Sequence, residues 1–256
     1  MLGAALTAEG RLLIAGVVLA AWFRLAGFDP QWRRYAGQYF AIGVVNMALP
    51  SLLYAFAMIH IPASLAAILN STSPMFGALF AALLLGERFT LRKALGCAAG
   101  ASGVALVARP EGLASTPMFG VAVAACLAAC LCYGYTGVVV RRYAAKTPSP
   151  GIAVGSQLAG AVLLLPLLPF SPPASEPTVV AVSNLVALAL LGNALGMVLY
   201  FRLIADVGAT RALTVTYLMP AFALLWGALF LGETFSASAL TGAVLILAGT
   251  VLVTRG

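Results

Sequence analysis

Residues 73–89, SPMFGALFAALLLGERF, form an imperfect repeat with residues 219–235, MPAFALLWGALFLGETF, at a fixed offset of 146 positions. The same offset holds without a gap from Tyr54–Arg109 to Tyr200–Arg255, and about 17 of these 56 aligned residues are identical. Both copies are almost wholly apolar. A repeat of this length in an apolar chain is typical of a membrane transporter built from two related halves.

The composition also indicates a membrane protein. Hydrophobic residues make up 62% of the chain and charged residues 8%, whereas soluble domains carry roughly 25% charged residues. The four cysteines lie inside apolar runs without a nearby histidine or carboxylate, so we expect no metal site. The net charge of +7 comes from Lys and Arg at the ends of apolar segments. That placement suits lipid headgroups and does not indicate nucleic-acid binding.

Nine segments are apolar enough to cross a membrane, which takes about 20 residues for a helix. We do not expect the first to be a signal peptide, because Glu9 and Arg11 stand at its head, Arg24 lies near its tail and it shows no clear small-residue cleavage site. We therefore predict an all-α polytopic membrane protein with one integral membrane domain, made of a first repeat at 1–112 and a second at 113–256. The predicted spans are 9–27, 37–59, 63–86, 91–108, 117–140, 150–170, 178–201, 207–231 and 236–254.

The positive charges predict the orientation of these spans. If the loop at 28–36 is cytoplasmic, 12 of the 14 Lys and Arg residues fall on the cytoplasmic side, and so does the C-terminus. The segment 86–93 carries three of them, whereas its partner in the second copy, 232–239, carries none. Equivalent loops thus face opposite sides. This arrangement predicts two inverted repeats, with a binding site near the midplane.

Three short motifs occur in both copies in the same order. The chain resembles the EamA type of the drug/metabolite transporter superfamily through these motifs, which together span both halves. They are PASLAAIL at 62–69, PMF at 74–76 and LGE at 85–87 in the first copy, and GAT at 208–210, PAF at 220–222 and LGE at 231–233 in the second.

This resemblance implies ten helices in two inverted halves of five, and a role in moving small metabolites across a membrane. The chain offers nine spans, and the span at 9–27 with its leading Arg11 is similar to the second helix of that pattern. We therefore expect the first helix of the first half to be missing from this sequence.

Polar residues inside the predicted spans are the candidates for substrate binding, because such groups are costly in hydrocarbon and usually face a cavity or another helix. Pro74 is expected to interrupt its helix and to free a carbonyl near Asn70. The alternative is that these side chains only bond neighbouring helices. The candidates are Asn46, Tyr54, Asn70, Ser73, Pro74, Gln157, Asn193, Tyr200, Thr216, Tyr217 and Pro220.

Ionisable residues fall at the edges of the spans. We interpret Glu87 and Glu233 as residues that start the next helix, where a carboxylate suits the helix dipole, with a gate or proton site as the alternative. The lone histidine, His60, lies at a boundary and is expected to be solvated. The sequence shows no carboxylate, Lys or Arg deep in a span, which favours a facilitator, or coupling through a glutamate at a helix end.

These features predict a secondary transporter or facilitator in the bacterial inner membrane that moves small metabolites, amino acids or amphipathic compounds, chiefly outward. An intramembrane enzyme is the first alternative, but the single histidine and seven scattered acidic residues provide no catalytic set. A non-transporting membrane subunit is the second. The expected partners are a small-molecule substrate and membrane lipids, with no nucleic acid and no cofactor; a homo-oligomer is left open.

Overall fold

The computed structural model describes residues 4–107, 117–144, 146–170, 176–207 and 215–255. Throughout these ranges the regular structure is helical and no strand occurs, which confirms the predicted all-α class. Seven of the described helical segments are long and apolar enough to cross a membrane. The other two predicted spans contain the 17-residue helices α6 (Leu91–Val107) and α12 (Val215–Leu231).

The chain forms two compact units, and each unit combines segments from both halves of the sequence. Unit 1 comprises residues 1–55 and 143–212. Its elements are α1 (Ala4–Leu25), α2 (Trp32–Ile42), η1 (Gly43–Ala48), the start of α3 (Leu49–His60), α8 (Ser149–Leu164), η2 (Leu165–Phe170), α9 (Val179–Ala187), η3 (Leu188–Leu195) and α10 (Gly196–Val207).

The core of unit 1 lies between α1 and α8. Leu12 on α1 packs with Ala161 on α8, and Leu19 packs with Val154, so the two helices run antiparallel. A Cβ at Gly16 would come within 2.7 Å of the Leu158 side chain, so glycine permits this close approach. Gly16 and the alanines of these two clusters therefore set the distance between the two helices.

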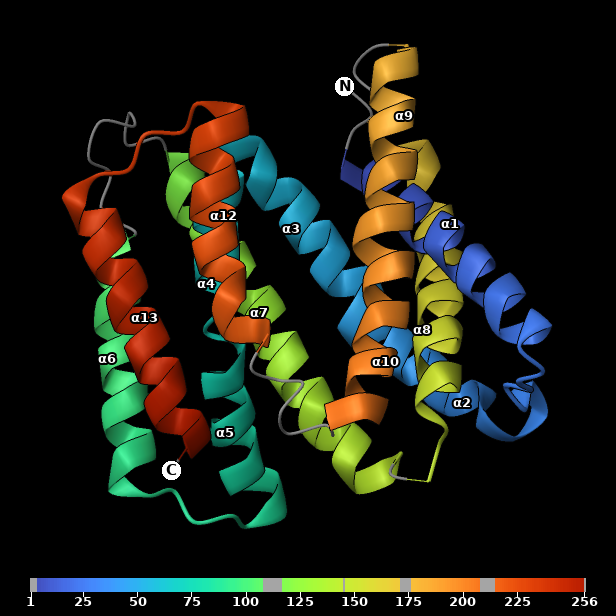
Figure 1. Cartoon of the computed structure of the whole chain (residues 1–256), viewed down its shortest axis with the longest axis horizontal. Coiled ribbons are helices and arrows are strands. Elements are labelled where there is room, and N and C mark those ends of the chain that lie inside the picture. The colour runs from blue at the N-terminus through green and yellow to red at the C-terminus, as the bar shows by residue number, and fades with distance from the viewer. Residues whose placement is uncertain (1–3, 108–116, 145, 171–175, 208–214, 256) are drawn as a thin grey trace. The chain divides into compact units, whose positions relative to one another are not determined.

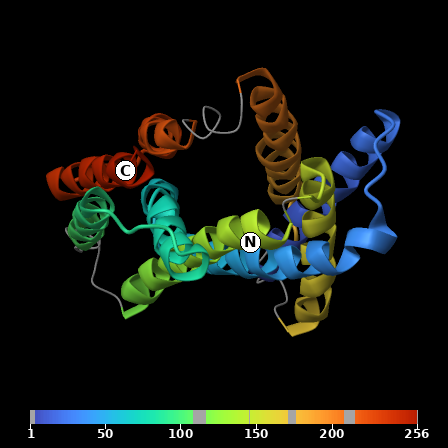
Figure 2. The ribbon, with the colours of Figure 1, turned by 90° about the horizontal axis from the view of Figure 1, so that it is seen from below.

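Unit 2 comprises residues 56–142 and 213–256. Its elements are the end of α3, α4 (Ala63–Asn70), α5 (Ser73–Leu85), α6, α7 (Pro117–Tyr143) up to residue 142, α12 and α13 (Ala237–Arg255). The most extensive packing joins α6 to α13, which lie side by side at one edge of the unit (Figures 1 and 2).

Glycines bring the backbones of α6 and α13 together. A Cβ at Gly96 would lie 2.6 Å from the Gly249 carbonyl oxygen, and a Cβ at Gly103 would lie 2.6 Å from that of Gly242. The 146-residue offset maps Gly96 onto Gly242 and Gly103 onto Gly249. The Gly96–Gly249 contact and the Gly103–Gly242 contact are therefore equivalent under the repeat. The helices are antiparallel, and within unit 2 the α5–α6 connection lies at the opposite end from the α12–α13 connection (Figure 1).

Both connections begin with the same helix terminator. Helix α5 ends before Gly86 (φ 68°), and α12 ends before Gly232 (φ 64°), in the left-handed conformation that glycine adopts without strain. The N–H of Glu87 then donates to the Ala81 carbonyl at 3.3 Å, and that of Glu233 donates to the Gly227 carbonyl at 3.0 Å. The repeated Gly-Glu pair is therefore a helix C-terminal motif.

The two glutamates do not start the next helices, so that interpretation is wrong. The caps are Thr90 and Ser236, which the offset also makes equivalent. Thr90 Oγ1 accepts from the N–H of Lys93 at 3.3 Å, and Ser236 Oγ accepts from that of Ala239 at 3.2 Å. Hydroxyl caps of this kind satisfy N–H groups that have no partner inside the helix.

Candidate functional site

Two π-helical segments occupy equivalent places in the two halves, and each carries a candidate asparagine. The 146-residue offset maps η1 onto residues 189–194, which lie within η3, and it places Asn46 on Gly192, next to Asn193. The Leu49 N–H bonds the Val44 carbonyl, five residues back, and the Gly196 N–H bonds that of Leu191. Segments of this type are rare and are often found at functional sites.

The first π segment packs on α8. A Cβ at Gly43 would lie 2.9 Å from the Ser156 carbonyl oxygen, and one at Gly160 would lie 2.8 Å from Met47. The structure thus brings together the elements that carry Asn46, which is half-buried, and Gln157, which is 1% exposed. The Gln157 Oε1 is buried and has no hydrogen-bond partner among the described residues. An amide in this state has unused hydrogen-bonding capacity.

The second π segment packs on α1, as η1 packs on α8. Ala194 joins the buried cluster of Ala15, Leu19 and Val154, and the neighbouring Asn193 is half-buried. Unit 1 also holds Tyr54, half-buried on α3, and Tyr200 on α10, whose side chain is outside the described part.

A buried glutamate on α1 was missed by the interpretation of the sequence. The helix begins at Ala4, so Glu9 lies inside it and is 5% exposed. Two residues later, the Arg11 guanidinium donates to Ser51 Oγ at 2.8 Å. The predicted span begins at Glu9, whereas the helix begins five residues earlier at Ala4, so Glu9 lies more than one turn inside the helix. The available signal was the apolar run that already starts at Ala4.

In unit 2 the predicted interruption before Pro74 is confirmed. Helix α4 ends at Asn70, and α5 begins at Ser73 with Pro74 in its first turn. The hydroxyl of Ser73 donates to the Asn70 carbonyl at 2.7 Å and lies 3.3 Å from the Asn70 side-chain Oδ1. The structure therefore brings Asn70 and Ser73 together, and the carbonyl that proline deprives of its partner is satisfied locally.

Other helices supply further donors to this interruption. The thiol of Cys130 on α7 donates to the Leu69 carbonyl at 3.3 Å, and the hydroxyl of Thr250 on α13 donates to the Ser71 carbonyl at 2.7 Å. The equivalent stretch of the second copy is helical from Val215 onward and contains Thr216, Tyr217 and Pro220, whose side chains are outside the described part. The two copies therefore differ at this turn.

Replacing Thr250 by valine should lower the stability of unit 2. The variant removes the donor of the half-buried Ser71 carbonyl and leaves that carbonyl beside an apolar side chain at the buried position 250, which costs about 1–3 kcal/mol. Thermal unfolding in detergent measures the change. Thr241→Val on the same helix is the control, because the Thr241 hydroxyl is exposed and bonds only its own helix, at Ala237. Equal losses in the two variants would contradict the role of Thr250.

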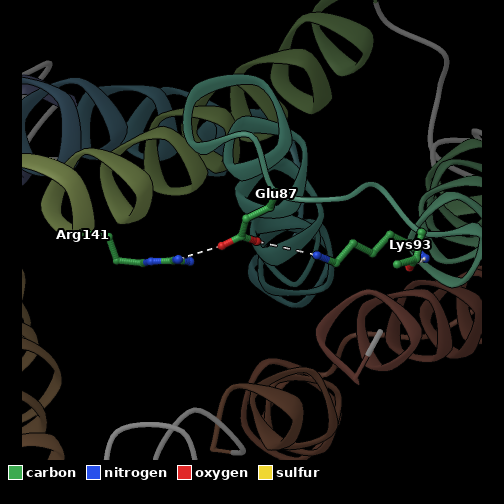
Figure 3. A network of polar contacts seen from close by, with 4 residues as sticks. Glu87, Lys93 and Arg141 are labelled. Carbon is green, nitrogen blue, oxygen red and sulfur yellow. Dashed lines mark hydrogen bonds and ion pairs between the residues drawn. The ribbon is translucent and has the colours of Figure 1, made fainter.

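An ion-pair cluster joins the α5–α6 connection to the end of α7 (Figure 3). Glu87 lies 2.6 Å from the Arg141 guanidinium and 3.7 Å from the Lys93 ammonium, and Arg142 donates to the Leu84 carbonyl at the end of α5. The hydrogen bond from Arg141, helped by the charges of Arg141 and Lys93, lowers the pKa of Glu87 below its ordinary 4.5.

This lowered pKa predicts a loss of stability in acid. The folded state binds the Glu87 proton less tightly than the unfolded state, so the contribution is present at neutral pH and disappears as the pH falls below about 4.5. The pair is partly exposed, so the expected size is about 0.2–1 kcal/mol. Glu87→Gln should flatten that part of a pH-dependent unfolding curve, whereas the exposed Glu176→Gln should not. An unchanged curve for Glu87→Gln would contradict the assignment.

Glu233 has a different partner at the other end of unit 2. Its carboxylate accepts a hydrogen bond from the hydroxyl of Ser64, which is buried at the start of α4. A Cβ at Gly227 would lie 2.7 Å from the Glu233 carboxylate, so glycine makes room for this contact. The two equivalent glutamates thus hold different elements, one through cations and one through a hydroxyl.

A concave region of about 510 Å³ runs along α9. None of the candidate substrate-binding residues is among its described lining residues, which are mostly apolar side chains suited to lipid contact. The lining residues are Pro177, Val179, Val182, Ser183, Val186 and Ala187.

Comparison with known proteins agrees with this architecture. A probable terminal-alkyne amino-acid exporter of Streptantibioticus cattleyicolor is 32% identical over 96% of this chain and 82% of its own length. The pseudopaline exporter CntI of Pseudomonas aeruginosa is 29% identical over 81% and 72%, and protein PecM of Dickeya dadantii is 24% identical over 95% and 80%. A solved crystal structure shares the fold, with a TM-score of 0.70 and 21% identity over 98% of this chain and 88% of that one.

The family model for EamA-like transporters matches twice, at residues 6–109 and 120–255. The two matches fall on the two halves that contain the repeat, and the resemblance drawn from the motifs is confirmed. They point to a transporter and away from an enzyme. The chain therefore belongs to the EamA-like transporter family and is a multi-pass membrane transporter, similar to proteins named as exporters.

Proposed function

We propose that this transporter exports small, zwitterionic, amino-acid-like metabolites across the bacterial inner membrane. The observation that carries the proposal is the interruption at Asn70–Ser73, where uncharged hydrogen-bonding groups lie at the meeting point of two half-helices. The C-terminal end of α4 carries partial negative charge, and the N-terminal end of α5 carries partial positive charge. Such a pair of ends suits the ammonium and carboxylate groups of a zwitterion.

The named relatives support the same substrate class. One relative is named as an amino-acid exporter, and the match covers 96% of this chain. We propose that substrate contacts in unit 1 come from Asn46 and Asn193 on the π segments and from Gln157 on α8. In unit 2 we propose Asn70 and Ser73 at the interruption. The further contacts in this proposal are Tyr54, Pro74, Tyr200, Thr216, Tyr217 and Pro220.

We further propose nine spans in two inverted repeats, 1–112 and 113–256, with the C-terminus in the cytoplasm. The equivalence of the Gly96–Gly249 and Gly103–Gly242 contacts under the repeat offset supports the inversion inside unit 2. The distribution of Lys and Arg along the sequence supports the orientation. Inverted repeats allow one site to open to either side in turn.

Purified protein in liposomes tests the substrate class. The vesicles are loaded with unlabelled L-propargylglycine, and uptake of the labelled compound by exchange is measured beside L-norvaline and the amphipathic cation ethidium. We expect exchange of the amino acids well above protein-free vesicles, with the compounds recovered chemically unchanged. Movement of ethidium alone would contradict the amino-acid class, and chemical conversion would favour the enzyme alternative.

A further inference from the structure

Glu9 is a buried carboxyl group inside a membrane-spanning helix. It lies on α1, in the span Ala5–Leu25, and is 5% exposed. Its Oε1 is fully buried and has no hydrogen-bond partner among the described residues. An ionised carboxylate in such a place is strongly disfavoured unless it is paired, so the group that fits this arrangement is the neutral, protonated carboxyl.

The five elements that pack most extensively on α1 offer Glu9 no compensating charge; they are α8, α9, η1, η2 and η3. Smaller contacts join α1 to α3, which ends at His60, and to α10, which carries Arg202 and Asp206. The sequences of these five elements contain no Asp, Glu, His, Lys or Arg. A carboxyl group that faces them can change its charge only by taking up or releasing a proton.

The nearest cation along the chain, Arg11, forms a hydrogen bond with another helix. Arg11 lies two positions after Glu9, and side chains at that spacing do not face each other on a helix. Its Nη2 donates to Ser51 Oγ on α3 at 2.8 Å. The Arg11 guanidinium therefore contacts α3, and this contact does not compensate the buried carboxyl of Glu9.

We propose that Glu9 is the proton-binding site that couples this transporter to the pH gradient. One proton binds the carboxylate from the acidic side and leaves the carboxyl on the alkaline side, and one substrate molecule moves the opposite way in each cycle. Charge and atoms balance, because the proton is the only species gained and lost at Glu9. This role rests on the proposed transport function and adds its coupling ion.

Infrared difference spectroscopy tests proton binding without any substrate. The purified protein is titrated with acid and base in lipid, and the band of protonated carboxyl groups is followed. We expect a titrating band in the wild type that is missing from Glu9→Gln, which keeps the side-chain size, and retained in the exposed Glu176→Gln. An identical titration of wild type and Glu9→Gln would overturn the proton site, whether or not the substrate class is right.

Transport in vesicles tests the coupling itself. With the membrane potential clamped, an acidic lumen one pH unit below the bath should let the wild type accumulate L-propargylglycine about tenfold, the limit for one-for-one exchange. Glu9→Gln should equilibrate to a ratio near one but keep substrate exchange, and Glu9→Asp should restore part of the accumulation. Full accumulation by Glu9→Gln would overturn the proposal. Absence of all wild-type exchange would count against the substrate class and leave the infrared result to decide Glu9.

Discussion

Replacing Asn70 by leucine is expected to abolish transport while the protein still inserts in the membrane. Leucine has the same number of side-chain heavy atoms and the same branching, but it removes the amide whose Oδ1 lies 3.3 Å from Ser73 Oγ at the interruption between α4 and α5. The carbonyl of Asn70 keeps its own donor from Ser73, so the helix break should persist. Flux per inserted protein in vesicles, normalised by quantitative detection, measures the loss.

The matched control for this variant is Asn184→Leu. Asn184 is exposed on α9, so the same exchange of chemistry there should leave the flux unchanged. Wild-type flux in Asn70→Leu at equal expression would reduce Asn70 to a residue that only holds neighbouring helices together. An equal loss in both variants would point to a general effect of removing asparagine.

Replacing Gly103 by valine is expected to give a larger loss of folded protein than Thr250→Val or Glu87→Gln. The new Cβ would lie 2.6 Å from the Gly242 carbonyl oxygen, so the backbones of α6 and α13 must move apart. Overpacking of this kind costs about 1–3 kcal/mol, and more where backbone atoms must shift. The yield of monodisperse protein and the midpoint of thermal unfolding in detergent report the effect.

Gly137→Val on α7 controls for the valine itself. A Cβ at Gly137 meets no atom within 4 Å, so the added side chain enters open space. This variant should unfold close to the wild-type temperature. If Gly103→Val did the same, the close contact between α6 and α13 would not carry the stability assigned to it.

The sequence predicted the parts of the fold that depend on local chemistry. Proline at 74 interrupts a helix, and glycine at 86 and 232 ends one in the left-handed conformation. Pro220, the equivalent of Pro74, instead lies inside α12. The repeat offset also predicted which features come in pairs. The helix caps at Thr90 and Ser236 follow the same offset, although the glutamates beside them were interpreted as the helix starts.

The remaining features depend on contacts between distant segments, which one sequence does not contain. The burial of Glu9 depends on how α1 packs with its neighbours, and its place near the predicted end of a span concealed it. The π segments arise where an extra residue is accommodated in a packed helix, and no residue type marks that event. The different partners of Glu87 and Glu233 follow from tertiary packing, because the local Gly-Glu motif is the same.

Single cysteines at two equivalent positions test the inverted repeat most directly. Arg88→Cys and Thr234→Cys, both exposed and related by the 146-residue offset, are made in a variant whose four native cysteines are replaced. Intact cells are treated with a membrane-impermeant maleimide. We expect labelling of Thr234→Cys in intact cells and of Arg88→Cys only after the membrane is opened. Labelling of both cysteines from the same side would contradict the inverted repeat.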